Sequence, residues 1–228
     1  DDSTVVAVKS GLKDINSLVT IVHGKEKRLS YIGSINSRLD YRNGKIYWTE
    51  IVPGLRWTHE NYSVLKCYDL KEGRIKSITP RQRYLSPSVD KNGKVAAVSR
   101  TTVDGKNQLV LVELEDGKEL FAFQVPDNAF IKELTFTDQD EVVAVAVTDA
   151  GISLLQFTPS SGQWEELLST ASVNITSPVW KDGRIYFESG ANGTNNLYCL
   201  DPADHQVYRL TCARFGAFDP SFTHSGNR

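Results

Sequence analysis

An all-β fold built from repeats is predicted by three observations on this 228-residue chain. A phrase made of a turn, a polar or basic residue and a strand recurs five times, with turn residues 49, 47, 43 and 43 positions apart. Only strand signals lie between these turns. Gly-containing turns divide each period into further short strands. A period in the forties of this kind is typical of a β-propeller, in which each repeat forms one four-stranded blade. The turns are Asn43-Gly44, Asn92-Gly93, Gln139-Asp140, Asp182-Gly183 and Ser225-Gly226.

The first strand of each repeat, strand a, is expected nearest the propeller axis. Three of these strands begin with a proline and carry a bulky residue shortly before the turn. Proline suits the first residue of a strand, where its missing N–H removes nothing from the ladder. The proline-initiated strands are Ser86-Pro87 with Val89, Ser177-Pro178 with Trp180 and Asp219-Pro220 with Phe222, and Tyr41 and Phe136 hold the bulky position in the others.

The second strand, strand b, follows each turn as an apolar run without polar alternation. Such a run suits a strand that is buried on both faces between neighbouring blades. These strands are Thr4 to Val8, Ile46 to Thr49, Val95 to Val98, Val142 to Val147 and Ile185 to Phe187.

The third and fourth strands, c and d, form a hairpin. Strand c reads Leu-x-x-x-acid in three repeats, and a tight polar turn with glycine then leads to a more amphipathic outer strand d. Strand c is expected at Ser17 to Val22, Leu65 to Asp69, Leu109 to Glu113 and Leu197 to Asp201. Strand d is expected at Lys27 to Ile32, Arg74 to Thr79, Glu119 to Val125, Trp164 to Ser169 and Gln206 to Thr211. Helix content should be close to nil.

The repeats place the whole chain, 1–228, in one propeller domain with about five blades. Repeats are expected at 1–36, 37–84, 85–132, 133–175 and 176–217, with 218–228 as the first strand of a further or closing blade. The first repeat lacks strand a. In one interpretation the last strand a completes the first blade and closes a five-bladed ring, which removes the open edge. In the other, which we favour, the chain is an excerpt of a six- to eight-bladed propeller.

Composition excludes several classes of function. The net charge is −2 and no long run of like charges is present, which argues against a nucleic-acid or membrane-surface binder. No apolar stretch approaches the length that spans a bilayer. The histidines and cysteines have no metal-ligand spacing, so no metal and no cofactor is expected. Cys67 and Cys199 occupy equivalent places in non-adjacent repeats and should remain unbridged.

One repeat in particular resembles those of TolB-like propellers. Ser86-Pro87-Ser88-Val89-Asp90-Lys91-Asn92-Gly93-Lys94-Val95 carries the resemblance, and Asp219 to Gly226 looks like the start of another copy. The same repeat style is found in the propeller domains of prolyl-oligopeptidase and tricorn-type peptidases. The family's Ser-Pro-Asp-Gly turn is degraded here. The resemblance implies a periplasmic or extracellular interaction module, with no catalytic residues in the propeller.

The two faces of the predicted ring differ in chemistry. The a–b and c–d turns form one face, which we call the turn face, and it is tight and rich in glycine. The b–c and d–a connections form the other, the loop face, with the longest loop, Val52 to Tyr62. Clustered Trp, Tyr and Arg are typical of binding surfaces. The candidate binding residues on the loop face are Arg56, Trp57, His59, Arg81, Arg83, Tyr84, Arg214 and Phe215.

The leading hypothesis is a non-catalytic, extracytoplasmic propeller that binds a protein, peptide or glycan partner at its loop face. One alternative is a propeller that gates substrate access to a peptidase domain of the same polypeptide. A second is a five-bladed glycoside-active enzyme, which needs a pair of axial carboxylates. Asp40, Asp90 and Asp138 are the candidates for that pair, although solvated turn residues would have the same pattern.

Overall fold

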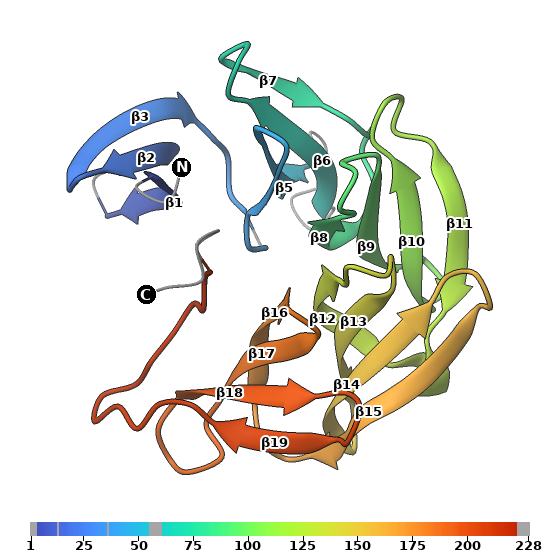
Figure 1. Cartoon of the computed structure of the whole chain (residues 1–228). Coiled ribbons are helices and arrows are strands. Elements are labelled where there is room, and N and C mark those ends of the chain that lie inside the picture. Colours follow the sequence, from blue (N-terminus) through green and yellow to red (C-terminus); the bar gives the residue numbers. More distant parts are fainter. Residues whose placement is uncertain (1–3, 13, 36, 55–60, 223–228) are drawn as a thin grey trace.

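Five antiparallel sheets stand as blades around a common axis in the computed structural model (Figure 1), which describes residues 4–12, 14–35, 37–54 and 61–222. Four blades have four strands and the first has three. This arrangement confirms the propeller predicted from the repeat. The first two blades contain β1 (Thr4–Gly11), β2 (Asp14–Val22), β3 (Lys25–Tyr31), then β4 (Asp40–Arg42), β5 (Lys45–Pro53), β6 (Asn61–Asp69) and β7 (Arg74–Ser77). The third contains β8 (Tyr84–Val89), β9 (Val95–Thr101), β10 (Asn107–Glu113) and β11 (Glu119–Gln124). The last two contain β12 (Phe130–Phe136), β13 (Val142–Thr148), β14 (Gly151–Thr158), β15 (Gln163–Ala171), then β16 (Ile175–Lys181), β17 (Arg184–Ser189), β18 (Asn196–Asp201) and β19 (Gln206–Arg209).

The apolar runs predicted as strand b are central strands with both faces buried. In β13, Val142, Ala144 and Ala146 pack against the third blade, on a cluster that includes Leu109. The alternate residues Val143 and Val145 pack against the fifth blade. Because successive side chains of a strand point to opposite faces, one short apolar run contributes to two interblade cores. This explains why strand b has no polar alternation.

Each Ser-Pro pair marks a bulge in strand a rather than its first residue. Ser86 and Ser177, which precede the prolines, have φ of 48° and 55°, and the ladder register shifts at both places. The ladder of strand a therefore loses no bond at the proline, because the bulge has already interrupted the pairing.

The first strand expected within 218–228 is not formed over its described part, Asp219 to Phe222, and the rest of that range lies outside the described residues. Asp219 reproduces the local conformation of the other Ser-Pro sites, with φ of 50°, and its N–H donates to Glu188 Oε1 at 2.7 Å. The segment nevertheless has no ladder partner, because β1 pairs only with β2. The carbonyl of Pro220 accepts a bond from Arg38 Nη2 at 3.4 Å, so the segment lies beside the second blade without joining a sheet.

The remaining elements agree with the composition. The helical structure of the described residues is one 3₁₀ turn, η1 (Pro126–Asn128), between the third and fourth blades. No helix in that part of the chain is long and apolar enough to cross a membrane. Cys67 and Cys199 are buried and unbridged, as expected, and Cys212 is exposed and free.

Candidate functional site

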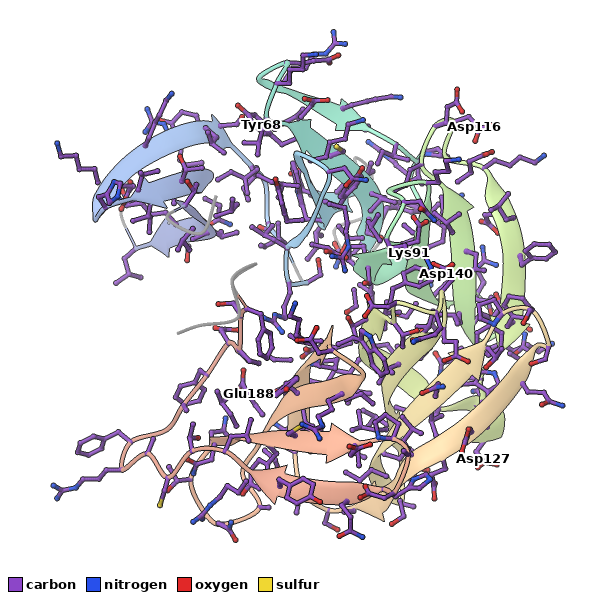
Figure 2. The ribbon with its side chains drawn as sticks, in the orientation of Figure 1. Tyr68, Lys91, Asp116, Asp127, Asp140 and Glu188 are labelled. Atoms are coloured by element: carbon purple, nitrogen blue, oxygen red, sulfur yellow. The ribbon has the colours of Figure 1, made fainter. Side chains whose placement is uncertain are left out.

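The turn face is held together by bonds from one a–b turn to the next. Asn43 Nδ2 donates to the carbonyl of Asn92 at 3.2 Å. Lys91 Nζ donates to the carbonyl of Asp138 at 2.7 Å and pairs with Asp140 at 3.3 Å; Figure 2 shows Lys91 and Asp140 side by side. The polar groups of these turns therefore satisfy one another.

The loop face carries a hollow of about 450 Å³ between the second and third blades. Its lining combines polar side chains with a larger share of apolar surface. Of the candidate binding residues, Arg83 lines this hollow, and Arg81 is exposed two residues earlier. The lining residues are Ile51, Asn61, Tyr62, Ser63, Arg83, Leu85 and Thr101.

A reciprocal backbone pair fixes the segment that carries both arginines. Ser63 N–H donates to the carbonyl of Gln82 at 2.7 Å, and Gln82 N–H donates to the carbonyl of Ser63 at 2.9 Å. In an extended chain, alternate residues point to the same side, so Arg81 and Arg83 share the side opposite Gln82. Within the described chain neither guanidinium has a hydrogen-bond or ion-pair partner, and both remain available to a ligand.

Tyr84 belongs to the interior rather than to the surface of this site. It is 1% exposed, and its hydroxyl donates to Glu119 Oε1, which also accepts a bond from Arg100 Nη1 at 2.7 Å. Burial and the bond to Glu119 raise the pKa of Tyr84 above its ordinary value. Tyr84 therefore links β8 to β11 of the third blade through its bond to Glu119. Because it follows Arg83 directly, this link also anchors the end of the arginine segment.

The other candidate residues do not gather at this hollow. Arg214 and Phe215 are both exposed, with the guanidinium 5.3 Å from the ring centre. They belong to the segment after β19, which lies across the ring from the β7–β8 connection (Figure 1). Arg56, Trp57 and His59 lie outside the described residues.

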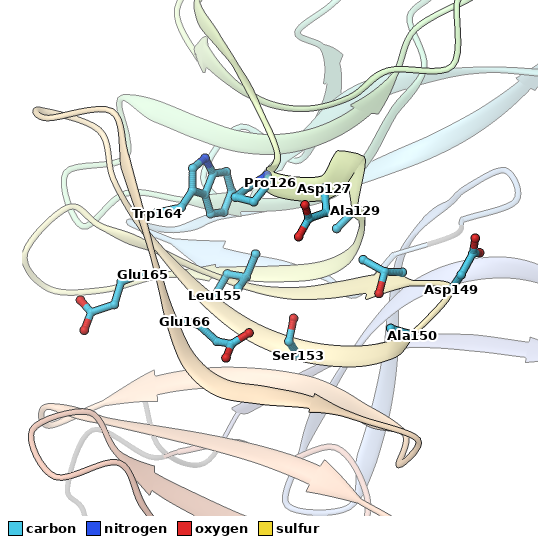
Figure 3. Close-up of a pocket in the computed structure, with 11 residues that line it drawn as sticks. Pro126, Asp127, Ala129, Asp149, Ala150, Ser153, Leu155, Trp164, Glu165 and Glu166 are labelled. Atoms are coloured by element: carbon cyan, nitrogen blue, oxygen red, sulfur yellow. The ribbon is translucent and has the colours of Figure 1, made fainter.

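A second hollow on the loop face, of about 500 Å³, lies between the third and fourth blades (Figure 3). It is lined by η1, the β13–β14 turn, and residues of β14 and of the first part of β15. Figure 3 shows Trp164 beside Pro126 at one end, Glu166 near Ser153, and the Glu165 carboxylate on the other side of β15. The residues that line it are Pro126, Asp127, Ala129, Thr148, Asp149, Ala150, Ser153, Leu155, Trp164, Glu165 and Glu166.

This second hollow is absent from the candidate residues chosen on sequence. The candidate binding residues are Arg, His and aromatic residues of loops, so acidic residues were not among them. Trp164 falls in a predicted strand d and not in a loop. A usable signal was present, because Asp127 and Asp149 fall in the d–a and b–c connections that the repeat assigns to the loop face.

The carboxylates proposed for a glycosidase do not form a pair. Asp90 accepts N–H bonds from Asn92, Lys94 and Val95, as a turn residue does. Asp138 accepts the indole N–H of Trp180 at 3.0 Å. Asp40 alone of the three lines the axial cavity of about 380 Å³. The arrangement gives the glycosidase alternative no support. In the described residues no three His, Cys, Asp or Glu side chains are grouped as a metal site would need.

Solved structures show the same fold in proteins of unlike sequence. TolB from Acinetobacter baumannii matches at a TM-score of 0.68 with 13% identity, over 91% of this chain and 52% of that one. The tricorn protease matches at 0.64 with 16% identity, over 92% and 22%. The β-propeller domain of the Trilobed protease from Pyrococcus furiosus, described as having an open velcro topology, matches at 0.56 with 12% identity, over 93% and 81%. The resemblance to TolB-like and peptidase propellers is confirmed for the fold.

This chain spans about half the length of the matched TolB chain. No family model matches the chain, and no curated protein matches it.

Proposed function

We propose that this propeller is a non-catalytic module that binds a polypeptide partner at its loop face. One observation carries the proposal: charged side chains beside the two hollows have no polar partner among the described residues. Three a–b turns bond to one another, whereas the side chains of Arg81, Arg83, Asp127, Asp149 and Glu166 make no hydrogen bond or ion pair with other described residues.

Unpaired charges of both signs beside two hollows favour a polypeptide over a simple glycan. A guanidinium offers a fixed fork of donors to a carboxylate, and a carboxylate accepts from a basic side chain or a backbone N–H. An extended peptide presents all of these groups. The loop face also has an exposed apolar residue, Val103, in the β9–β10 turn. Its side chain is 94% exposed and is free to contact an apolar side chain of a partner.

A selection experiment tests the proposal. Phage displaying random dodecapeptides are panned on the immobilised chain, and each enriched peptide is synthesised for titration. We expect R81A/R83A to raise Kd about tenfold, as loss of interface arginines commonly does. The control, K71A/R74A, removes two exposed cations from the turn face of the same blade, Lys71 in the c–d turn and Arg74 at the start of β7, and should leave Kd unchanged.

The proposal is overturned if no peptide is enriched. It is equally overturned if enriched peptides respond to K71A/R74A and not to R81A/R83A. The extracytoplasmic location and the gating role beside a peptidase domain stay predictions, because the structural likeness concerns the fold.

A further inference from the structure

The second hollow has the composition of a receptor for a basic side chain. No Lys or Arg is among the described residues that line it. Its carboxylates, from Asp127, Asp149 and Glu166, make no ion pair or hydrogen bond with other described residues. Uncompensated carboxylates in one hollow repel each other, and a bound cation would relieve that repulsion.

The hydroxyl of a largely buried residue points into the same space. Ser153 is 6% exposed, lies on the face of β14 that also carries Leu155, and has no hydrogen-bond partner among the described residues. In Figure 3 its hydroxyl and the Asp127 carboxylate are directed toward one another across the hollow. The hydroxyl faces the hollow with its acceptor unused, so it can accept a bond from a ligand donor.

The apolar wall matches the stem of a long basic side chain. Trp164 is held in place, because its indole N–H donates to the carbonyl of Gln124 at 3.1 Å and its ring lies 4.7 Å from that of Phe157. Pro126 and Leu155 complete this wall. Lys and Arg bury their methylene groups on such surfaces, and a guanidinium also stacks on indole.

The η1 turn, which carries both Pro126 and Asp127, is preformed. Asn128 Oδ1 accepts the N–H of Asn107 at 2.7 Å, and Asn128 Nδ2 donates to the carbonyl of Gly105 at 3.0 Å. These bonds fix η1 on the β9–β10 turn. Asp127 therefore keeps its place without a ligand, and little ordering is needed on binding.

We propose that this hollow binds a basic side chain, arginine in preference to lysine, of the polypeptide partner; the inference rests on the proposed function and names the chemistry of its ligand. The stem lies along Trp164 and Leu155. The guanidinium donates to the carboxylates of Asp127 and Glu166 and to the Ser153 hydroxyl. Arginine is preferred because its planar fork reaches several acceptors and stacks on the indole.

The test uses amino-acid amides, so that it does not depend on finding the partner. Nα-acetyl-arginine methylamide, its lysine counterpart and its uncharged citrulline counterpart are titrated into ¹⁵N-labelled protein. The Trp164 indole N–H signal, identified by its loss in W164F, reports occupancy. We expect the arginine amide to shift it at lower concentration than the lysine amide, and the citrulline amide to leave it in place.

Charge-removing variants locate the site. E166Q should raise Kd for the arginine amide several-fold and D127N/E166Q about tenfold. The control E115Q removes an exposed carboxylate from a c–d turn and should change nothing. Raising the salt should weaken binding, because the hollow is open to solvent. Amide spectra of each variant confirm that the fold is intact.

Two results overturn the inference: equal shifts by the citrulline and arginine amides, or arginine binding that survives D127N/E166Q. Its failure is distinguishable from failure of the proposed function. If the selected peptides bind the loop face and still bind after each of their own Lys and Arg residues is replaced, the inference is wrong and the proposed function stands. Arginine-amide binding without any enriched peptide would sink the proposed function alone.

Discussion

At the scale of single residues, Asp40 shows how a polar group joins two blades. Its Oδ2 accepts the Ser88 hydroxyl at 3.0 Å and the Val89 N–H at 2.6 Å, so strand a of the second blade is bonded to strand a of the third. Burial raises the pKa of Asp40, and the charge of Arg42 together with the bonds from Val89 and Ser88 opposes that rise without cancelling it. The folded protein therefore binds a proton at Asp40 more tightly than the unfolded chain does.

This pKa difference predicts the sign of a pH dependence. Because the folded pKa is the higher one, ionisation of Asp40 costs stability as the pH rises from the ordinary value of 3.8 through the raised pKa. D40N keeps an acceptor for both bonds and has no charge. We expect the free energy of unfolding of D40N, measured with urea from pH 3.5 to pH 7, to rise relative to wild type across this window. D149N is the control, and a D40N difference that stays flat with pH contradicts the prediction.

A binding role for Arg81 and Arg83 stays a prediction, and the sequence was least informative about the burial of Tyr84. The repeat assigned all three to a d–a connection on the loop face. Whether an aromatic residue there is exposed depends on a partner 35 positions later, Glu119, which takes the hydroxyl bond. No local pattern encodes that pairing.

At the scale of elements, tight turns of similar sequence differ in how closely they approach a neighbouring blade. Gly117 and Gly183 both have positive φ, of 77° and 79°. A Cβ on Gly117 would lie 2.1 Å from the carbonyl oxygen of Ile78 in the preceding blade, whereas a Cβ on Gly183 meets nothing within 4 Å. The turn at Gly117 is therefore packed against the segment that precedes its blade, whereas the turn at Gly183 has open space around it.

This difference gives a matched pair of substitutions. G183A should lower the free energy of unfolding by about 1 kcal/mol, the cost of an L residue in the left-handed region. G117A adds a backbone clash and should cost about 3 kcal/mol or more. Urea unfolding of the two variants measures both values, and equal losses would show that the Gly117 contact does not restrain the blades.

Most strands were predicted correctly because a run of apolar residues between turn signals suits few other structures. Their ends were less predictable, since β5 extends to Pro53 and β15 to Ala171. The exception is Asp219 to Phe222. Its local conformation follows from the sequence, but a strand exists only where another strand offers a ladder.

At the scale of the whole molecule, stability should be greatest in the middle blades. The third and fourth blades have neighbours on both sides, and β13 is buried from Val142 to Ala146. The first blade has three strands, and every residue of β19 in the last blade is exposed. Local opening is easiest where buried apolar contacts are fewest.

Hydrogen exchange followed by mass spectrometry tests this gradient. Amides of β13 should exchange slowest, and those of β1, β3 and β19 faster by about tenfold or more. Bound arginine amide should slow exchange in η1 and β15 and leave β19 unchanged. Equal protection in all five blades would contradict the gradient and indicate one cooperative unit.

The repeated turn, the apolar runs and their spacing were sufficient to establish the propeller, because side-chain alternation and turn chemistry are local properties of a chain. The assignment of each loop to a face followed from the same pattern. The two hollows, the burial of Tyr84 and the open position of Asp219 to Phe222 required the tertiary structure. Each depends on which residues of neighbouring blades meet, and those contacts join positions about 20 to more than 180 residues apart.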